Sequence, residues 1–260
     1  MGKNGIALRP SYWASVSGGK DSLYMLYLIM QNPDRWPLDG VVHYELETDF
    51  PFIRDVADRM KEICEKAGVM FFSLKPSRTW DELNEKYGYP NLRKRWCNDM
   101  YKLDAQKKLK DFLRQQGKYL VSYIGFCADE VKRFRFELND RGQNVTQIYP
   151  LAEAGVPEEY IWRWARTEPL FNNYYVYNRR CGCICCPMSS YSNLAYAAQF
   201  YLDIYEHYMK MAEEHEEKRA REKESDRHDI LTFRGGMTVA EIREKVKMRL
   251  PCVPLQEWKR

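Results

Sequence analysis

A glycine-rich run near the amino terminus has the residue types of a phosphate site. It reads Ser-Gly-Gly-Lys-Asp-Ser over residues 17–22 and joins a strand-like apolar stretch to a helical pattern. Adjacent glycines let the backbone approach a bulky ligand closely, and the N–H groups at a helix start attract anions. Lys20 adds an ammonium group, Ser17 and Ser22 add hydroxyl donors, and Asp21 can cap the helix or help to hold a magnesium ion. The alternative is a helix-capping turn without a ligand.

A dense group of cysteines forms the second candidate site. Four of the eight cysteines lie within residues 181–186, where Cys183 and Cys186 make a Cys-x-x-Cys pair followed by Pro187. Such a pair places two thiolates on one metal ion, and Gly182 eases the tight turn. Cysteine ligands with no histidine nearby suit a [4Fe–4S] cluster or a structural zinc ion. Redox-active or free thiols are the remaining alternative.

An alternation of strand-like and helix-like segments must position these two sites. Apolar runs predict five strands, at residues 12–16, 40–44, 69–74, 119–124 and 148–151. Helical periodicity predicts helices from about residue 21 and at residues 52–67, 80–87, 102–116 and 158–166. The third run is apolar throughout, which is typical of a strand covered on both faces. The alternation of strands and helices implies right-handed βαβ units and therefore an α/β fold with a doubly wound, mostly parallel five-stranded sheet.

The region after the cysteines is predicted to be helical. Residues 191 to about 223 indicate one long helix whose second half is polar all round and projects into solvent. Residues 238–248 indicate a basic amphipathic helix. We therefore expect a nucleotide-binding domain with the cysteine cluster over residues 1–190 and a helical C-terminal extension over residues 191–260.

Length, composition and charge limit the classes of protein to which the chain can belong. A chain of 260 residues suits one large domain or one domain with an appendage. It has no apolar run of the ~20 residues that span a bilayer, and residues 1–5 lack the apolar core of a secretory signal. We therefore expect a soluble, cytoplasmic protein with no membrane partner, and eight cysteines in such a chain argue against a disulfide framework. The net charge of +4 permits contact with nucleic acid without demanding it.

Residues 17–22 resemble the PP-loop of the ATP pyrophosphatase, or adenine nucleotide alpha-hydrolase-like, superfamily, and we call them the PP-loop. Four further stretches are similar to motifs of its phosphoadenylyl-sulfate (PAPS) reductase branch: HYELETDFP at 43–51 to "DTGxEFP", RKRWCNDMYK at 93–102 to "RxC....K", GFCADEVKR at 125–133 to "GxRxxES..R" and RRCGCICCP at 179–187 to "RxGCxxCP". The chain departs from these motifs at Glu45 and Glu47, which replace an aspartate and a glycine. It also has Phe126 or Cys127 where the family has an arginine.

The resemblance implies a nucleotide site and a metal site. Its nucleotide-contacting residues would be Ser17, Gly18, Gly19, Lys20, Asp21, Ser22, Glu45, Gly125, Glu130 and Arg133, and the catalytic ones Lys20, Asp21 and Arg133. Its metal ligands would be Cys97, Cys181, Cys183 and Cys186, with Cys185 as an alternative fourth ligand. The implied cofactors are ATP or an adenylyl-sulfate nucleotide, Mg²⁺, and a [4Fe–4S] cluster with Zn²⁺ as the alternative.

The activity implied by the resemblance is sulfur transfer after ATP-dependent adenylation, of the kind that thiolates tRNA or DNA. True PAPS reductases attack the nucleotide's sulfur with a cysteine in a C-terminal "ECG" segment. This chain offers only Cys252 in a Leu-Pro-Cys-Val-Pro sequence, so PAPS or adenylyl-sulfate reduction is the alternative. A non-catalytic nucleotide-sensing or partner-binding module is the third reading. The implied partners are a nucleotide substrate, a nucleic-acid acceptor, a sulfur donor such as a cysteine desulfurase, and a second copy in a homodimer.

Overall fold

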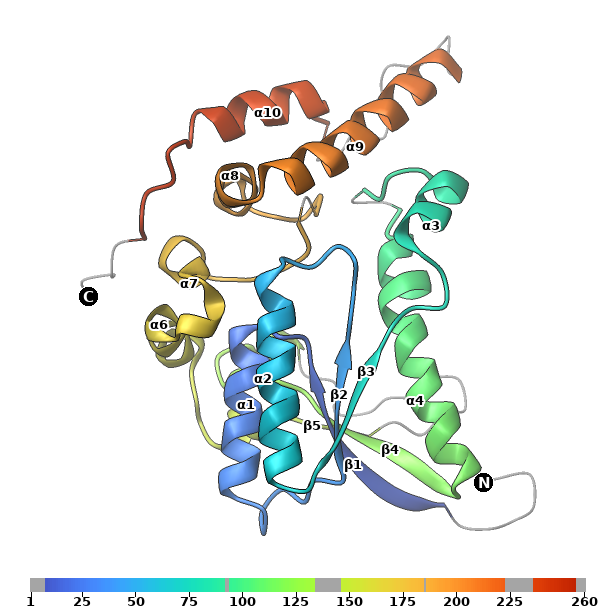
Figure 1. Cartoon of the computed structure of the whole chain (residues 1–260), viewed down its shortest axis with the longest axis vertical. Coiled ribbons are helices and arrows are strands. Elements are labelled where there is room, and N and C mark those ends of the chain that lie inside the picture. Colours follow the sequence, from blue (N-terminus) through green and yellow to red (C-terminus); the bar gives the residue numbers. More distant parts are fainter. Residues whose placement is uncertain (1–7, 92–93, 134–145, 185, 223–235, 256–260) are drawn as a thin grey trace. The chain divides into compact units, whose positions relative to one another are not determined.

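The computed structural model describes residues 8–91, 94–133, 146–184, 186–222 and 236–255 (Figure 1). The chain divides into two compact units. The first, which we call the sheet unit, comprises residues 1–46, 51–76 and 103–172, and the second, the helical unit, comprises residues 47–50, 77–102 and 173–260. The expected division into domains at residue 190 stays a prediction.

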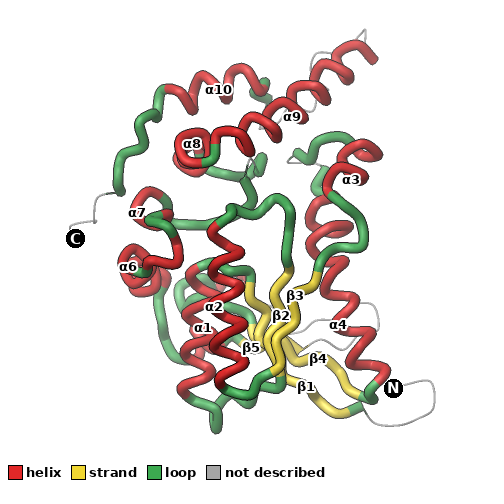
Figure 2. Tube along the Cα trace, viewed as in Figure 1, coloured by secondary structure: helices red, strands yellow, loops and turns green. Residues whose placement is uncertain are grey.

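The sheet unit is built on five parallel strands. They are β1 (Arg9–Val16), β2 (Gly40–Tyr44), β3 (Met70–Leu74), β4 (Lys118–Tyr123) and β5 (Thr146–Ile148), in the order β3-β2-β1-β4-β5. Figure 2 shows the strands together as one sheet, with helices beside it. The predicted five-stranded parallel α/β sheet is therefore confirmed. Its strand order reverses between β1 and β4, and open α/β sheets bind ligands at such a point, beyond the carboxyl ends of the strands.

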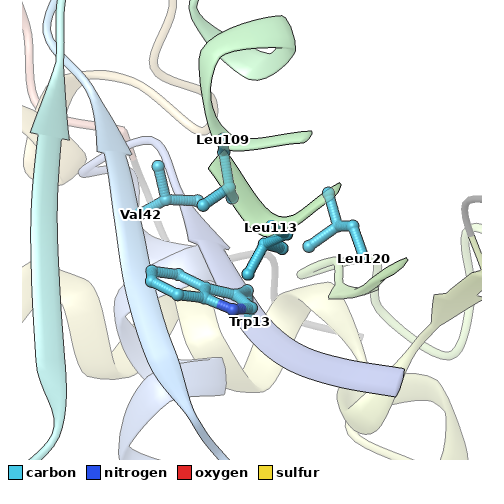
Figure 3. Close-up of a cluster of buried hydrophobic side chains, with 5 residues drawn as sticks. All are labelled: Trp13, Val42, Leu109, Leu113 and Leu120. Atoms are coloured by element: carbon cyan, nitrogen blue, oxygen red, sulfur yellow. The ribbon is translucent and has the colours of Figure 1, made fainter. Parts of the chain in front are cut away.

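Helices cover both faces of this sheet. α1 (Lys20–Gln31) and α2 (Phe52–Lys66) lie on one face, and α4 (Leu103–Gln115) lies on the other (Figure 1). Figure 3 shows the core under α4, in which three strands and the helix contribute Trp13, Val42, Leu109, Leu113 and Leu120. These side chains are at most 3% exposed. The shorter elements of the unit are η2 (Val131–Arg133), α5 (Pro150–Glu153), α6 (Glu158–Thr167) and η3 (Pro169–Phe171).

Two details of the sheet differ from prediction. β3 was expected to be covered on both faces, but it is an edge strand and Met70 is 45% exposed. The last strand ends at Ile148 instead of residue 151, because Pro150 begins the short helix α5. Proline suits the first position of a helix, where its missing N–H is not needed.

The helical unit consists of α3 (Trp80–Tyr87), the π-helix η1 (Cys97–Lys102), α7 (Tyr174–Tyr177), α8 (Tyr191–Phe200), α9 (Leu202–Glu222) and α10 (Val239–Lys247). The single helix predicted after residue 191 is wrong, since α8 and α9 are separate helices with Tyr201 between them. The second half of α9 is not free in solvent either. His215 lies against the backbone of Gly88, and the Glu216 carboxylate accepts the N–H of Val239 at 2.9 Å.

None of the helices in the described part of the chain is long and apolar enough to cross a membrane.

Candidate nucleotide site and cysteine pocket

The PP-loop connects β1 to α1 and is shaped by its own residues. Gly18 has φ +76°, and a Cβ atom there would lie 2.7 Å from Cγ2 of Ile53, so glycine is required on both counts. The Ser22 hydroxyl donates to the Gly19 carbonyl at 2.9 Å and accepts the N–H of Ser17 at 3.3 Å. Gly19 is the N-cap residue of α1, and no side chain caps the helix there. The local sequence therefore produces the strand–turn–helix geometry of an anion site.

Lys20 is held between two carboxylates in the sheet unit. Its side chain is 1% exposed, and Nζ lies 2.6 Å from Oδ1 of Asp21 and 3.5 Å from Oε1 of Glu158. Burial raises the pKa of Asp21, although the Lys20 ammonium acts in the opposite direction. Cys127 lies with Sγ 3.5 Å from the same Asp21 oxygen. Burying a charged group is costly unless it is paired, and the two carboxylates supply that pairing for Lys20.

Glu158 was missed by the sequence analysis. It is the first residue of α6, and its backbone N–H donates to Oδ1 of Asp129 at 3.1 Å. An acidic residue in the first turn of a helix is ordinary, so nothing local marked it as a partner of Lys20. The packing of α6 against α1 brings the two residues together.

Gly125 lies close to the PP-loop, and its predicted contact with a nucleotide stays a prediction. A Cβ atom there would lie 3.1 Å from backbone atoms of Asp21 and Ser22, so this glycine lets the end of β4 approach the PP-loop itself. The Glu130 carboxylate accepts the N–H of Cys127 at 3.3 Å and closes the turn after β4. The backbone of Arg133 ends η2, but its side chain lies outside the described residues.

Two residues at the end of β2 have structural partners. Glu45 pairs with Lys75 at 3.1 Å and accepts the hydroxyl of Ser73 at 3.3 Å, and both of these contacts lie on the β3 side of the sheet. His43 is 2% exposed, with Nδ1 3.1 Å from the carbonyl oxygen of Val16, the residue before the PP-loop. Burial lowers the pKa of His43. A carbonyl oxygen only accepts, so Nδ1 donates the hydrogen of this bond.

Three of the four predicted metal ligands line one pocket of the helical unit. Cys97 comes from η1, and Cys183 and Cys186 come from the segment after α7. The other lining residues are Trp80, Pro90, Asn91, Arg95, Asn98, Lys102, Ile184, Pro187 and Met188. The pocket therefore joins two segments that lie more than 80 residues apart in the chain, and it places two basic side chains beside the thiols.

The thiols of this pocket act on one another and on Lys102. The Cys183 sulfur attracts and hydrogen-bonds the Lys102 ammonium, which raises the pKa of Lys102. Burial raises the pKa of Cys97 to about 11, with the neighbouring Cys183 and Cys186 adding to the effect. Burial likewise raises the pKa of Cys186. A thiol-binding metal must displace the protons of these cysteines, and a nearby ammonium lowers the cost.

The donor set of the pocket fits a thiolate-bound metal or cluster by its chemistry, since soft sulfur ligands select zinc and iron–sulfur clusters. The thiols are neighbours rather than a closed coordination shell. In the described part of the chain, no three His, Cys, Asp or Glu side chains converge closely enough to hold a metal ion. The predicted ligand set thus stays a prediction.

The remaining cysteines of interest lie elsewhere or are not described. Cys181 hydrogen-bonds the Tyr174 hydroxyl and interacts electrostatically with Asp49, and it is not among the residues that line the pocket. Cys185 lies outside the described residues. Cys252 is a half-buried free thiol whose backbone N–H donates to Oε1 of Gln199 at 2.6 Å.

The strand order, the loop after β1 and the thiol pocket define an α/β protein of PP-loop type with a second, cysteine-lined site. The profile of the phosphoadenosine phosphosulfate reductase domain matches residues 11–189, and the chain belongs to this family.

Known proteins resemble the chain at low identity. An uncharacterized protein of Methanocaldococcus jannaschii is 25% identical over 203 residues, which are 74% of this chain and 45% of that protein. The chain thus spans less than half the length of this curated relative. The U34-tRNA thiolase NcsA of Methanococcus maripaludis, solved with its [4Fe–4S] cluster, aligns over 93% of this chain and 82% of its own, with 17% identity and a TM-score of 0.43. The PAPS reductase of Candida auris, solved as a phosphate complex, aligns over 67% and 81%, with 11% identity and a TM-score of 0.39.

Proposed function

We propose that this protein is a PP-loop enzyme that adenylates an acceptor with ATP and then transfers sulfur to it, with a nucleic acid as the acceptor. The observation that supports this function is the presence, in one chain of the PAPS reductase family, of a PP-loop with a buried lysine and a pocket lined by three thiols. The first suits activation by a nucleotide, and the second suits the handling of sulfur.

At the PP-loop, Lys20 would neutralise charge that develops on the β-phosphate. Asp21, released from Lys20, would help to hold Mg²⁺. An acceptor oxygen attacks the α-phosphorus, the bond to the β-phosphate oxygen breaks, and pyrophosphate leaves. A sulfur nucleophile then bonds to the acceptor atom that carries this oxygen, and AMP leaves with the oxygen.

In the cysteine pocket, Cys97, Cys183 and Cys186 would hold the [4Fe–4S] cluster or, as the alternative, zinc, with Cys181 or Cys185 as the fourth ligand. A bound cluster would supply a centre that can carry the sulfur to be transferred. Lys102 would stabilise the ionised thiols, because its ammonium already hydrogen-bonds Cys183.

The test is pyrophosphate release from ATP and Mg²⁺, measured with and without bulk tRNA or DNA. We expect pyrophosphate to form faster with the nucleic acid that serves as acceptor, and AMP to be released in an equal amount only when sulfide is added as the sulfur nucleophile. If ATP stays intact under all conditions, the proposed activation chemistry is wrong.

Reduction of PAPS or adenylyl sulfate is the second candidate, and the family match itself favours it. In that reaction a thiolate attacks the nucleotide's sulfur, the sulfur–oxygen bond to the phosphate breaks, and a dithiol donor such as reduced thioredoxin releases sulfite. Cys252 is the candidate nucleophile. A reductase would lose thioredoxin-dependent sulfite release in Cys252→Ser, whereas the proposed enzyme keeps its pyrophosphate release in the same variant.

A further inference from the structure

A short segment of the helical unit touches both chain segments that supply the pocket cysteines. This segment, residues 47–50, belongs to the helical unit although its sequence neighbours on both sides belong to the sheet unit. Its residues contact η1, which carries Cys97, and the turn that carries Cys183 and Cys186. Since those cysteines are far apart in sequence, something must hold their two segments opposite each other.

Glu47 makes the largest share of these contacts. Its backbone N–H donates to the Tyr101 hydroxyl at 2.9 Å, and that hydroxyl lies 3.3 Å from Oε2 of Glu47, to which it donates. The same carboxylate oxygen accepts the N–H of Trp80, the first residue of α3, at 2.7 Å. The Glu47 carbonyl accepts the hydroxyl of Tyr208 in α9 at 3.1 Å. One residue thus ties three helices together through four hydrogen bonds.

The link to η1 is close to the reactive groups. Tyr101 is 1% exposed, follows Cys97 by four residues and directly precedes Lys102. A tyrosine hydroxyl has one hydrogen to donate and accepts through its lone pairs, and both functions are used on Glu47. Loss of the carboxylate would leave this buried hydroxyl and the N–H of Trp80 without that acceptor.

The next two residues contact the cysteine turn. The carbonyl of Thr48 accepts the N–H of Ile184 at 2.8 Å, and Ile184 directly follows Cys183. Asp49 interacts electrostatically with Lys102 and with Cys181. Three consecutive residues therefore contact η1 and the cysteine turn together.

We infer that Glu47 is a positioning residue for the cysteine pocket, which holds η1 so that Cys97 and Lys102 face Cys183 and Cys186. Its carboxylate stands where the family motif that the segment resembles has glycine, which has no side chain to make this link. Residues that orient metal ligands commonly change metal affinity by about 10–100-fold when they are mutated.

The inference is tested on the full-length, metal-free protein, so that it does not depend on the proposed sulfur transfer. Two readouts are the yield of a disulfide between Cys97 and Cys183 or Cys186 under mild oxidation, mapped by mass spectrometry, and the affinity for Zn²⁺ measured against a chelating dye. We expect Glu47→Ala to lower both, with the Zn²⁺ affinity falling roughly tenfold or more. Glu47→Gln, which keeps an acceptor oxygen, should restore part of the loss.

The matched control is Glu82→Gln. The Glu82 carboxylate accepts the N–H of Thr79 at 2.9 Å and caps the same helix α3, and this capping bond joins neither cysteine segment. We expect it to keep the wild-type disulfide yield and Zn²⁺ affinity. If Glu47→Ala folds and matches this control in both readouts, the positioning role is refuted.

Tyr101→Phe guards against a Glu47 variant that fails to fold. It removes only the hydroxyl and should reduce both readouts to about the extent that Glu47→Gln does. Combining it with Glu47→Ala should cause little further loss, because both changes break the same link. Additive losses would contradict the inference. If the wild-type protein forms no pyrophosphate but the variants still show these effects, the proposed function is refuted and the positioning role of Glu47 stands.

Discussion

The PP-loop and the cysteine pocket differ in the length of chain that must fold before each exists. The PP-loop uses six consecutive residues whose shape follows from Gly18, the Ser22 hydrogen bonds and the start of α1. The pocket collects residues from position 80 to position 188 and depends on hydrogen bonds from residues 47 and 48. The loop is therefore specified locally, and the pocket is specified by tertiary structure.

Because of this difference, we expect a change that impairs one site to leave the other site intact. A change within the PP-loop should affect nucleotide chemistry and spare the thiols, whereas a change in the pocket should alter metal binding and spare pyrophosphate release. Lys20→Ala and Cys97→Ser test that independence directly.

The largest effect is expected for Lys20→Ala. Removal of the ammonium should lower kcat/KM for pyrophosphate release from ATP by roughly 10²–10³-fold, because a preorganised charge on the reacting phosphates is lost. The Zn²⁺ affinity of the cysteines should be unchanged. Lys61→Ala is the control, since Lys61 is exposed and lies 3.8 Å from Glu65 on the surface of α2. An equal loss in both variants, or a loss of Zn²⁺ binding in Lys20→Ala, would contradict the comparison.

The reciprocal change is Cys97→Ser. A hydroxyl is a poor ligand for the metals that the pocket suits, so Zn²⁺ affinity should fall more than about tenfold. Pyrophosphate release should stay at the wild-type level. Cys252→Ser, which changes a thiol outside the pocket lining, should keep its metal. Wild-type metal content in Cys97→Ser would remove this cysteine from the ligand set.

A smaller effect, on stability, is expected from Gly18→Ala. The positive φ alone costs about 1–2 kcal/mol for a residue with a Cβ, and the contact of that Cβ with Ile53 adds roughly 1–3 kcal/mol of overpacking. Gly68→Ala isolates the first contribution, because Gly68 has φ +67° and nothing within 4 Å of its Cβ position. Denaturant unfolding should show the larger loss in Gly18→Ala. Equal losses of stability in the two variants would mean that the Ile53 side chain moves aside without an energetic cost.

The smallest effect concerns His43 and pH. Its folded-state pKa is lowered by burial, so on acidification the unfolded state takes up the proton first and the free energy of unfolding falls as pH drops below about 6.5. One such group contributes a slope of up to about 1.4 kcal/mol per pH unit. His43→Asn should flatten the curve between pH 7 and 5, measured by denaturant unfolding. An unchanged slope in His43→Asn would assign the acid sensitivity to other groups.

The same contrast explains what could be predicted from the sequence. Hydrophobic patterns and the residues that interrupt them predicted β2 at residues 40–44 and α3 at residues 80–87, and the structure has the same bounds. Both are short segments with clear local signals. The PP-loop was recognised for the same reason, since its chemistry lies in adjacent residues.

Most failures depend on tertiary contacts, whereas the early end of β5 follows locally from Pro150. The exposure of β3 follows from its place at the sheet edge, which no local pattern reveals. The pairing of Glu158 with Lys20 requires α6 to pack on α1, and the polar half of α9 was predicted free because its contacts with Gly88 and Val239 are distant in sequence. Glu47 was noted only as a departure from a motif, and its hydrogen bonds to Tyr101 and Trp80 appear only in the folded chain.

The central claim, that the chain joins nucleotide activation to cluster-assisted sulfur transfer, is tested most directly by the metal content of the wild-type protein. The protein would be purified without oxygen, and its iron, acid-labile sulfide and zinc would be determined per chain together with the visible spectrum. The account predicts about four irons and four sulfides per chain, as a [4Fe–4S] cluster requires. A colourless protein without iron, whether or not it holds zinc, would contradict it.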